Sequence, residues 1–152
     1  MRGARGRALA AALLLALTLA AGACAPAVKT RAFAIRTDTE ANRRSPVPVD
    51  LVLVYDRTLA GELAGATARD WFRRREQIGR DYPDGVRWLS WELVPGQNLP
   101  RHRMALRRRG AHAAFVFADY LEPGEHRLRL DPIPDATVWL GTDGMSLQTP
   151  LP

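Results

Sequence analysis

Short apolar segments, separated by turns that contain proline or glycine, run through the sequence from residue 47 almost to its end. In 86–94 and 111–118 the large apolar side chains recur at every second position, which is the period of a β-strand. The stretches 81–85 and 122–125 combine proline and glycine with acidic residues, a composition typical of tight turns. This pattern predicts a mainly β protein, an antiparallel β-sandwich. We expect strands near 33–36, 47–55, 86–94, 104–106, 111–118, 128–130, 136–140 and 145–147.

The segment 47–55 is apolar on both of its faces. Leu51 and Leu53 share one face with the other odd-numbered positions, and Val52 and Val54 make the opposite face apolar as well. A strand of this kind has no side that suits water. It is therefore predicted to be a central strand, in a sandwich or beneath a helix.

Between the second and third expected strands the sequence has a helical pattern. Thr67 can cap a helix because an acidic residue follows three positions later. Trp71 and Ile78, seven residues apart, fall on one side of that helix. The spacing of Leu59 and Leu63 indicates a preceding helical turn. We expect one helical insertion in the sandwich.

The N-terminus has the pattern of an export signal. Arg2, Arg5 and Arg7 precede an apolar run from Ala8 to Ala21. These fourteen residues would extend about 21 Å as a helix, which is too short for a hydrocarbon core of about 30 Å. The run therefore predicts a signal peptide rather than a permanent membrane span.

Small residues lead directly to the only cysteine of the chain, in the order Ala21-Gly22-Ala23-Cys24. This order resembles the bacterial lipobox, in which the cysteine is acylated on its thiol and becomes the new N-terminus. The alternative is an ordinary signal-peptidase site after Ala23. The lipobox resemblance implies lipidation of Cys24, and Ala25 after it implies sorting to the outer membrane.

We accordingly divide the chain into three parts. Residues 1–23 are expected to be the lipoprotein signal peptide and 24–31 a lipidated tether, because this stretch is small, polar and contains proline. Residues 32–152 are expected to form the β-sandwich domain.

Composition excludes several classes of protein. A single cysteine allows no internal disulfide and no multi-cysteine zinc site. Removal of the three N-terminal arginines with the signal peptide lowers the formal net charge from +6 to +3. That excess is too small to predict a nucleic-acid-binding face.

The candidates for chemistry are three histidines, His102, His112 and His126, together with four glutamates. No two histidines have a metal-binding spacing such as H-E-x-x-H, and no serine lies in G-x-S-x-G. We therefore expect no catalysis, no metal and no cofactor. A small hydrolase that uses His112 remains the enzymatic alternative.

Two surface features remain open. The arginines between Arg101 and Arg109 form the densest basic cluster, either a solvated strand face or a site for anionic lipid or an acidic partner. Trp71 and Trp91 are expected in the core, whereas Trp88 and Trp139 could form an exposed cluster for a glycan or another solute.

The order of these features resembles the type VI secretion outer-membrane lipoproteins of the TssJ (SciN) family. The similarity covers most of residues 24–148. It is carried by the lipobox, a helical insertion rich in aromatic residues, and a strand that ends in Pro-Gly. The matching positions are Asn42, Ser45-Pro46-Val47, Val54-Tyr55, Trp71, Phe72 and Leu93-Val94-Pro95-Gly96-Gln97.

The resemblance implies a transthyretin-like sandwich on the periplasmic face of the outer membrane. Such a protein anchors the secretion membrane complex by binding the periplasmic C-terminal region of a TssM-type inner-membrane protein, with no small-molecule substrate. A periplasmic glycan- or solute-binding lipoprotein is the alternative. In the family the loop between the first two strands contacts the partner, which here implies Asp38, Thr39, Glu40, Asn42, Arg43, Arg44 and Ser45.

Overall fold

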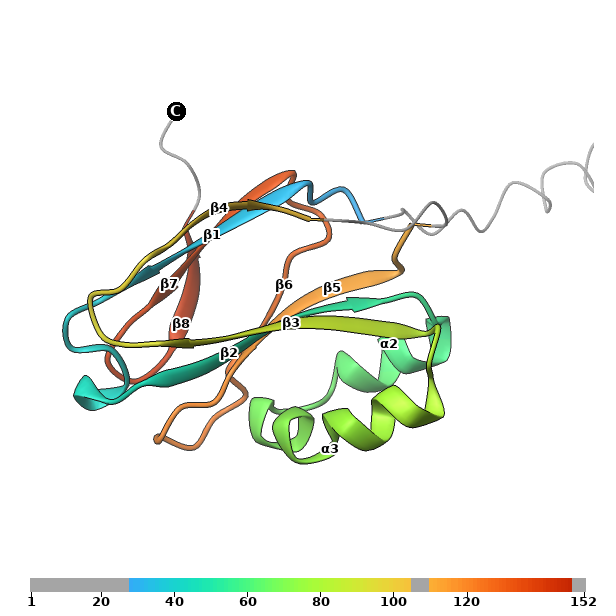
Figure 1. Ribbon diagram of the computed structural model, residues 1–152, viewed down its shortest axis with the longest axis horizontal. Coiled ribbons are helices and arrows are strands. Elements are labelled where there is room, and N and C mark those ends of the chain that lie inside the picture. The colour runs from blue at the N-terminus through green and yellow to red at the C-terminus, as the bar shows by residue number, and fades with distance from the viewer. Residues whose placement is uncertain (1–27, 105–109, 149–152) are drawn as a thin grey trace, which may run out of the picture.

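The computed structural model describes residues 28–104 and 110–148, which form two four-stranded sheets packed face to face (Figure 1). The first sheet has the order β4-β1-β7-β8 and the second has the order β3-β2-β5-β6. The strands of the first sheet are β1 (Ala32–Thr37), β4 (Leu99–Arg103), β7 (Asp135–Leu140) and β8 (Met145–Gln148). Those of the second sheet are β2 (Val47–Val54), β3 (Val86–Leu93), β5 (Ala113–Ala118) and β6 (Arg127–Arg129).

This architecture confirms the predicted β-sandwich with a helical insertion. Neighbouring strands pair antiparallel except for β1 and β7, which run parallel with Ala32 opposite Asp135 and Thr37 opposite Leu140. That pairing joins the two ends of the domain sequence. Such a long-range pairing leaves no pattern in either strand alone.

The main core lies between the sheets, where inward side chains from strands of both sheets meet. Phe33 and Ile35 of β1 pack there against the odd-numbered residues of β2. Strand β2 is central, as predicted, because β3 and β5 flank it and apolar layers cover both of its faces.

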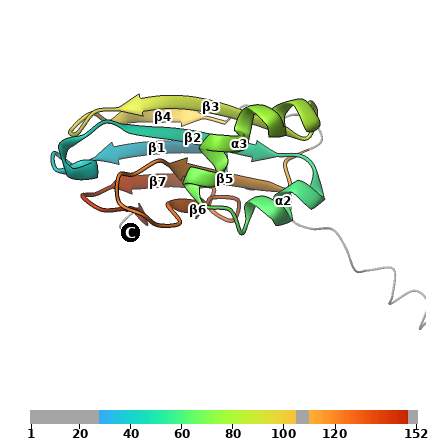
Figure 2. The same ribbon diagram turned by 90° about the horizontal axis from the view of Figure 1, so that it is seen from below.

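Two helices, α2 (Arg57–Leu63) and α3 (Ala68–Asp81), form a third layer on the outer face of the second sheet (Figures 1 and 2). The carboxylate of Asp56 caps α2 by accepting the Leu59 amide at 2.8 Å. Thr67 caps α3 as predicted, since its hydroxyl accepts the Asp70 amide at 3.1 Å. In the part of the chain that is described, neither helix is long and apolar enough to cross a membrane.

Trp71 fixes α3 on the sheet. Its fully buried ring stacks on Phe117 of β5 and makes an edge contact with Trp88 of β3, with ring centroids 5.5 and 5.6 Å apart. Gly79 lets α3 approach Trp88, because a Cβ on Gly79 would lie 2.7 Å from the indole ring. The aromatic residues of the insertion are therefore largely packing residues.

The structure contains a strand that the sequence analysis did not expect. This strand, β4, ends at Arg103, and residues 105 and 106 of the strand expected at 104–106 lie outside the described residues. An edge strand beside β1 needs few apolar residues, so β4 shows no strand pattern in the sequence. Residues 28–31, expected in the tether, are bonded into the domain: Val28 and Lys29 donate backbone hydrogen bonds to the carbonyls of Ala111 and Asp131.

Candidate functional site

The loop between β1 and β2 contains a left-handed turn. It forms the short 3-10 segment η1 (Ala41–Arg44), in which Asn42, Arg43 and Arg44 have φ angles of 47°, 53° and 64°. Residues other than glycine avoid this region because Cβ crowds the backbone, at about 1–2 kcal/mol each. Asparagine tolerates it better than arginine does. Three such residues in a row require surrounding contacts that hold the turn.

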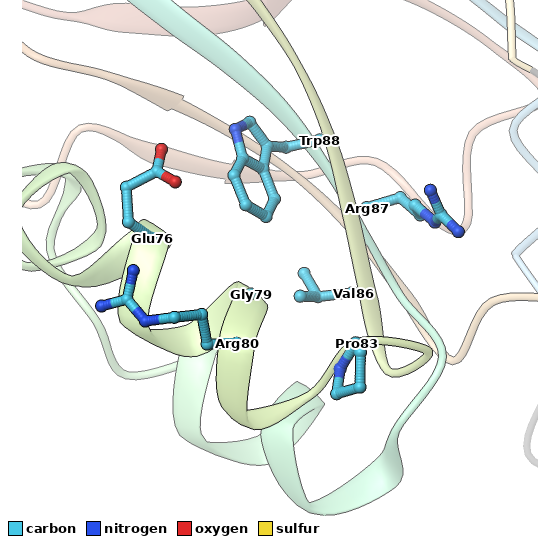
Figure 3. A pocket seen from close by; sticks show the side chains of 7 residues that line it. All are labelled: Glu76, Gly79, Arg80, Pro83, Val86, Arg87 and Trp88. Atoms are coloured by element: carbon cyan, nitrogen blue, oxygen red, sulfur yellow. The ribbon is translucent and has the colours of Figure 1, made fainter.

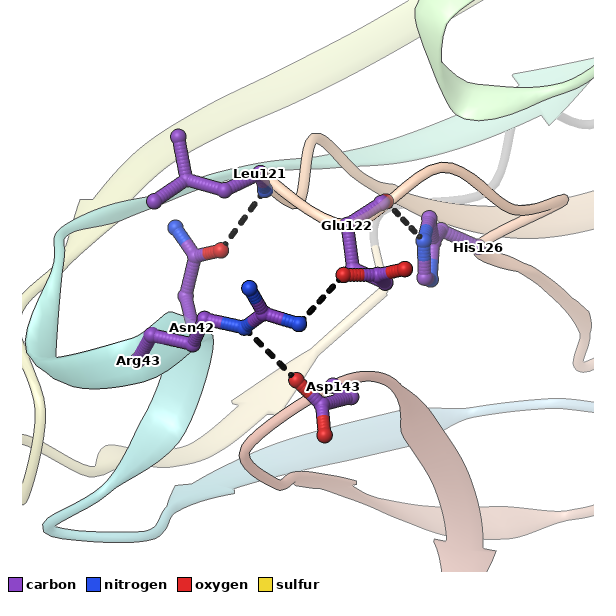
Figure 4. Close-up of polar contacts among 6 residues, drawn as sticks. All are labelled: Asn42, Arg43, Leu121, Glu122, His126 and Asp143. Carbon is purple, nitrogen blue, oxygen red and sulfur yellow. Dashed lines mark hydrogen bonds and ion pairs between the residues drawn. The ribbon is translucent and has the colours of Figure 1, made fainter.

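Asn42 provides two of those contacts. Its side chain is buried, its Nδ2 donates to the Pro46 carbonyl at 2.8 Å, and its Oδ1 accepts the Leu121 amide at 2.7 Å (Figure 4). The second bond joins the β1–β2 loop to the β5–β6 loop. Asn42 therefore shapes this surface from within, and its amide is not available for a direct contact with a partner.

Arg43 joins a third loop to the first two. Its Nη2 bonds Glu122 of the β5–β6 loop at 2.5 Å, and its Nε bonds Asp143 of the β7–β8 turn at 3.1 Å (Figure 4). The hydrogen bond to Asp143 and the charge of Glu122 raise the pKa of Arg43 above its ordinary value. Exposed pairs of this kind contribute little stability singly. Here they fix the relative position of three loops.

Arg44 is held within the β1–β2 loop itself. Its Nε donates to both carboxylate oxygens of Glu40, at 3.0 and 2.9 Å, which raises the pKa of Arg44. The carboxylate of Asp38 accepts the Glu40 amide at 2.9 Å. These contacts orient one acidic and one basic side chain toward solvent.

Two aromatic rings stabilise the β5–β6 loop. Tyr120 and His126 stack with centroids 4.7 Å apart, and Nε2 of His126 donates to the Glu122 carbonyl at 2.7 Å (Figure 4). The Tyr120 hydroxyl donates to the Gly144 carbonyl at 2.8 Å, and burial raises the pKa of this phenol. His126 is thus a structural residue of the loop.

These contacts assemble one surface, which we name the loop end: 38–45, 119–126 and 141–144. Of the residues expected to bind a partner, Thr39, Glu40, Arg43 and Arg44 are exposed, Asp38 and Ser45 are half-buried, and Asn42 is buried.

Sequence reasoning missed the contribution of the other two loops. Leu121, with 61% of its surface exposed, stands beside the Asn42 loop, and Glu122 and Asp143 hold Arg43. An apolar residue in a proline–glycine turn was a possible signal for Leu121. The two acidic residues carried no signal, because they meet Arg43 only after the sheets have formed.

The loop end lies opposite the point where the chain enters the sandwich. Val28 and Lys29 bond to residues just before β5 and just after β6, whereas η1 contacts the segments that follow β5 and β7. Figure 1 shows the start of β1 and η1 at opposite ends of the sandwich. Cys24 lies outside the described residues.

The histidines occupy three separate environments. His102 packs its ring against Phe33 and Trp91, His126 braces the loop end, and His112 lies half-buried beside α2. Across 28–104 and 110–148, no three histidine, cysteine or acidic side chains gather in a way that could hold a metal ion.

The tryptophans do not form one exposed platform. Trp88 lies on the second sheet against α3, whereas Trp139 lies on β7 of the first sheet. Trp71 is fully buried and Trp91 packs partly against the main core, as predicted. A glycan-stacking site made of Trp88 and Trp139 therefore has no geometric basis.

The basic cluster is described only in part. Arg101, His102 and Arg103 are exposed on β4, and Arg101 pairs with Asp135 at 2.5 Å. Arg107, Arg108 and Arg109 lie outside the described residues. The part that is described behaves as a solvated edge strand.

The fold is similar to that of solved type VI secretion proteins. The Lip protein of Serratia marcescens, a membrane-bound component of the type VI secretion system, superposes with a TM-score of 0.61 at 16% identity, covering 80% of this chain and 99% of its own. The type VI secretion lipoprotein TssJ1 from Pseudomonas aeruginosa gives 0.61 at 18% identity, covering 84% and 100%. A type VI membrane complex contains a chain that gives 0.60 at 20% identity, covering 80% and 99%.

The sequence itself matches no family model and no curated protein. At these identities the similarity concerns the fold. The fold expected from the TssJ resemblance is thus confirmed, over most of the chain.

Proposed function

We propose that this protein is a non-catalytic outer-membrane lipoprotein that anchors a type VI secretion membrane complex. Its acylated Cys24 would hold it to the periplasmic face of the outer membrane. Its loop end would bind the periplasmic C-terminal region of the large TssM-type inner-membrane component. The similarity in fold to membrane-bound type VI secretion lipoproteins supports this role.

The observation that carries the proposal is the placement of the loop end. It lies opposite the N-terminal end of the domain, and three loops are bonded together there around Asn42 and Arg43. A domain tethered at one end presents its other end to the periplasm. Pre-ordered loops lose little conformational entropy when a partner binds.

Tethering requires no chemistry at this site. An anchor that confines the domain to a surface raises its effective concentration for a partner that is confined to the same complex. Exposed charges at the loop end would orient the partner as it binds, and the exposed Leu121 would provide apolar contact area.

The test measures, by calorimetry, the binding of the purified periplasmic region of the inner-membrane component to the mature domain. We expect Arg44→Glu to weaken binding about tenfold or more, because it reverses a loop-end charge and places it beside Glu40. Arg44 is the better test residue than Asn42, whose loss would disturb the loop itself.

Arg74→Glu is the matched control. Arg74 is an exposed arginine on α3, outside the three segments of the loop end, so its reversal should leave affinity unchanged. Equal affinity of the wild type and Arg44→Glu would remove the loop end from the interface. No binding by the wild type would overturn the proposed function.

The anchor has its own test. Cys24→Ser should move the protein from the outer-membrane fraction to the soluble periplasm, because the serine hydroxyl cannot replace the acylated thiol. A mature protein that sediments with membranes equally with and without Cys24 would rule out lipidation as the anchor.

A further inference from the structure

Strand β3 has an open edge, and it differs from the other three edges of the two sheets. Among the described strands, β3 pairs only with β2. The edge strands β6 and β8 have three and four residues, and β4 has five, of which Pro100, Arg101 and Arg103 oppose further pairing. Strand β3 has eight residues and no proline. By its length and its lack of proline, β3 is therefore the least protected edge of the described sheets against a further strand.

The hydrogen-bond ladder fixes which groups of β3 face outward. The Tyr55 amide donates to the Gly85 carbonyl at 2.7 Å, and the register continues with Leu53 opposite Arg87. In an antiparallel ladder, hydrogen-bonded pairs alternate with pairs that are not bonded to each other. The N–H and C=O groups of Trp88, Ser90 and Glu92 therefore point away from β2, toward the open side.

A groove flanks this edge on the helix side. It has a volume of about 350 Å³ and lies between α3 and β3, with Glu76 and Arg80 on the helix and Trp88 on the strand (Figure 3). Gly79 also lines this groove. Glu76 already has a cation nearby, because its carboxylate lies 3.7 Å from Nε of Arg75.

A second groove flanks the same edge on the opposite face. It has a volume of about 300 Å³ and is lined mainly by apolar side chains, among them Leu51, Leu53, Leu89 and Met104. Leu89 belongs to β3 and has 45% of its surface exposed. The two grooves meet at Arg87 and Trp88, whose side chains point to opposite sides of the strand (Figure 3).

We propose that the β3 edge binds an extended acidic segment of a partner, which adds to the second sheet as a further strand. The main chain of the segment would bond the outward groups of β3, and its alternate side chains would enter the two grooves, since strand side chains alternate with a period of two. An apolar side chain fits the groove that contains Leu89. A carboxylate fits beside Arg87, with which no carboxylate among the described residues pairs.

Charge favours another protein over a second copy as the occupant. Arg80, Arg87 and Arg103 are exposed along this side of the domain. The exposed acidic residues of the groove and strand are Glu76, which has Arg75 nearby, and Glu92. A second copy would bring the same three arginines. An acidic segment complements them. The inference rests on the proposed function, because it assigns the segment to the same inner-membrane partner.

The test is Ser90→Pro in the mature domain, with the periplasmic region of the inner-membrane partner as the probe. Proline removes an outward N–H without removing a bond to β2 and is tolerated on edge strands. We expect about a tenfold or greater loss of affinity, from the lost hydrogen bond and the steric block. Ser90→Thr, which retains the N–H, is the matched control and should bind normally.

Arg87→Glu leaves the backbone unchanged and is the second test variant, for the case in which Ser90→Pro does not fold. It should also lower the affinity for the partner. Normal affinity in both variants, with a wild type that binds, overturns the added strand and leaves the proposed function intact. No binding by the wild type overturns both. A wild-type dimer in sedimentation that Ser90→Pro dissociates would assign the edge to a second copy and overturn the acidic segment.

Discussion

The indole Nε1 of Trp71 donates a hydrogen bond of 2.8 Å to Oδ2 of Asp50, a fully buried carboxylate in the middle of β2. Nη1 of Arg75 bonds the same oxygen, also at 2.8 Å. Oδ1 of Asp50 has no partner among the residues described. A buried charge with this few partners is costly to disturb. The pair therefore determines how α3 sits on the sheet.

Trp71→Phe should lower the free energy of unfolding by about 2–3 kcal/mol, because it removes one of two donors to a buried carboxylate. Urea denaturation followed by far-ultraviolet circular dichroism measures this. Trp139→Phe is the matched control: Trp139 is half-buried on the first sheet, and its replacement should cost less than about 1 kcal/mol. Equal losses in the two variants would show that the bond to Asp50 contributes nothing beyond aromatic packing.

Arg44→Gly should be more stable than Arg44→Ala by about 0.5–1 kcal/mol. Both variants lose the pair with Glu40, but only glycine relieves the left-handed φ of 64°. Chemical denaturation of the two variants gives the difference directly.

The control for that comparison is Arg36, an exposed residue of β1 outside the turn. At position 36 the alanine variant should be more stable than the glycine variant, because glycine in a strand costs about 0.5–1 kcal/mol relative to alanine. The same order at both positions would mean that the turn carries no backbone strain.

The start of α3 should weaken in acid. A hydrogen bond from Thr67 and a further one from Arg73 hold the pKa of Asp70 below its ordinary value. Because the folded pKa is the lower one, this stabilisation is present above the unfolded pKa of about 4 and is lost as the pH falls through the folded value. At pH 6 the wild type should therefore have a higher melting temperature than Asp70→Asn. The difference between the two melting temperatures should disappear toward pH values of about 2–3. A constant gap would contradict the assignment.

Leu121→Ala should weaken binding of the inner-membrane periplasmic region about tenfold and leave the melting temperature unchanged. The side chain is mostly exposed, so its loss removes contact area at the interface and not packing in the core. Leu121→Met keeps the apolar volume and should bind as the wild type does. Equal affinity for alanine and leucine would place Leu121 outside the interface.

Local patterns were sufficient for the elements that contain their own signals. Thr67 and Asp70 mark the start of α3, and the two apolar faces of 47–54 mark a central strand. The turn over 83–85 follows from its proline and glycine. In each case the residues that determine the structure are neighbours in the sequence.

The site depended on contacts that no local pattern records. The side-chain amide of Asn42 is buried against Leu121, which is 79 residues away in the sequence. The position of the Arg43 side chain is fixed by Asp143, which is 100 residues away. Strand β4 carries mostly polar and charged side chains, and only its pairing with β1 makes it a strand. The sequence therefore predicted the β1–β2 loop as part of the site. The contributions of the β5–β6 and β7–β8 loops could be identified only from the folded structure.

The position of β1 has a mechanical consequence. This one strand of six residues runs from the end of the domain where the chain enters to the loop that contains Asn42, so it links the side of the proposed anchor to the proposed docking loop. A pull between membrane and partner would follow the covalent backbone of β1. The hydrogen bonds of the sandwich would then carry little of the tension, and the domain could transmit force without unfolding.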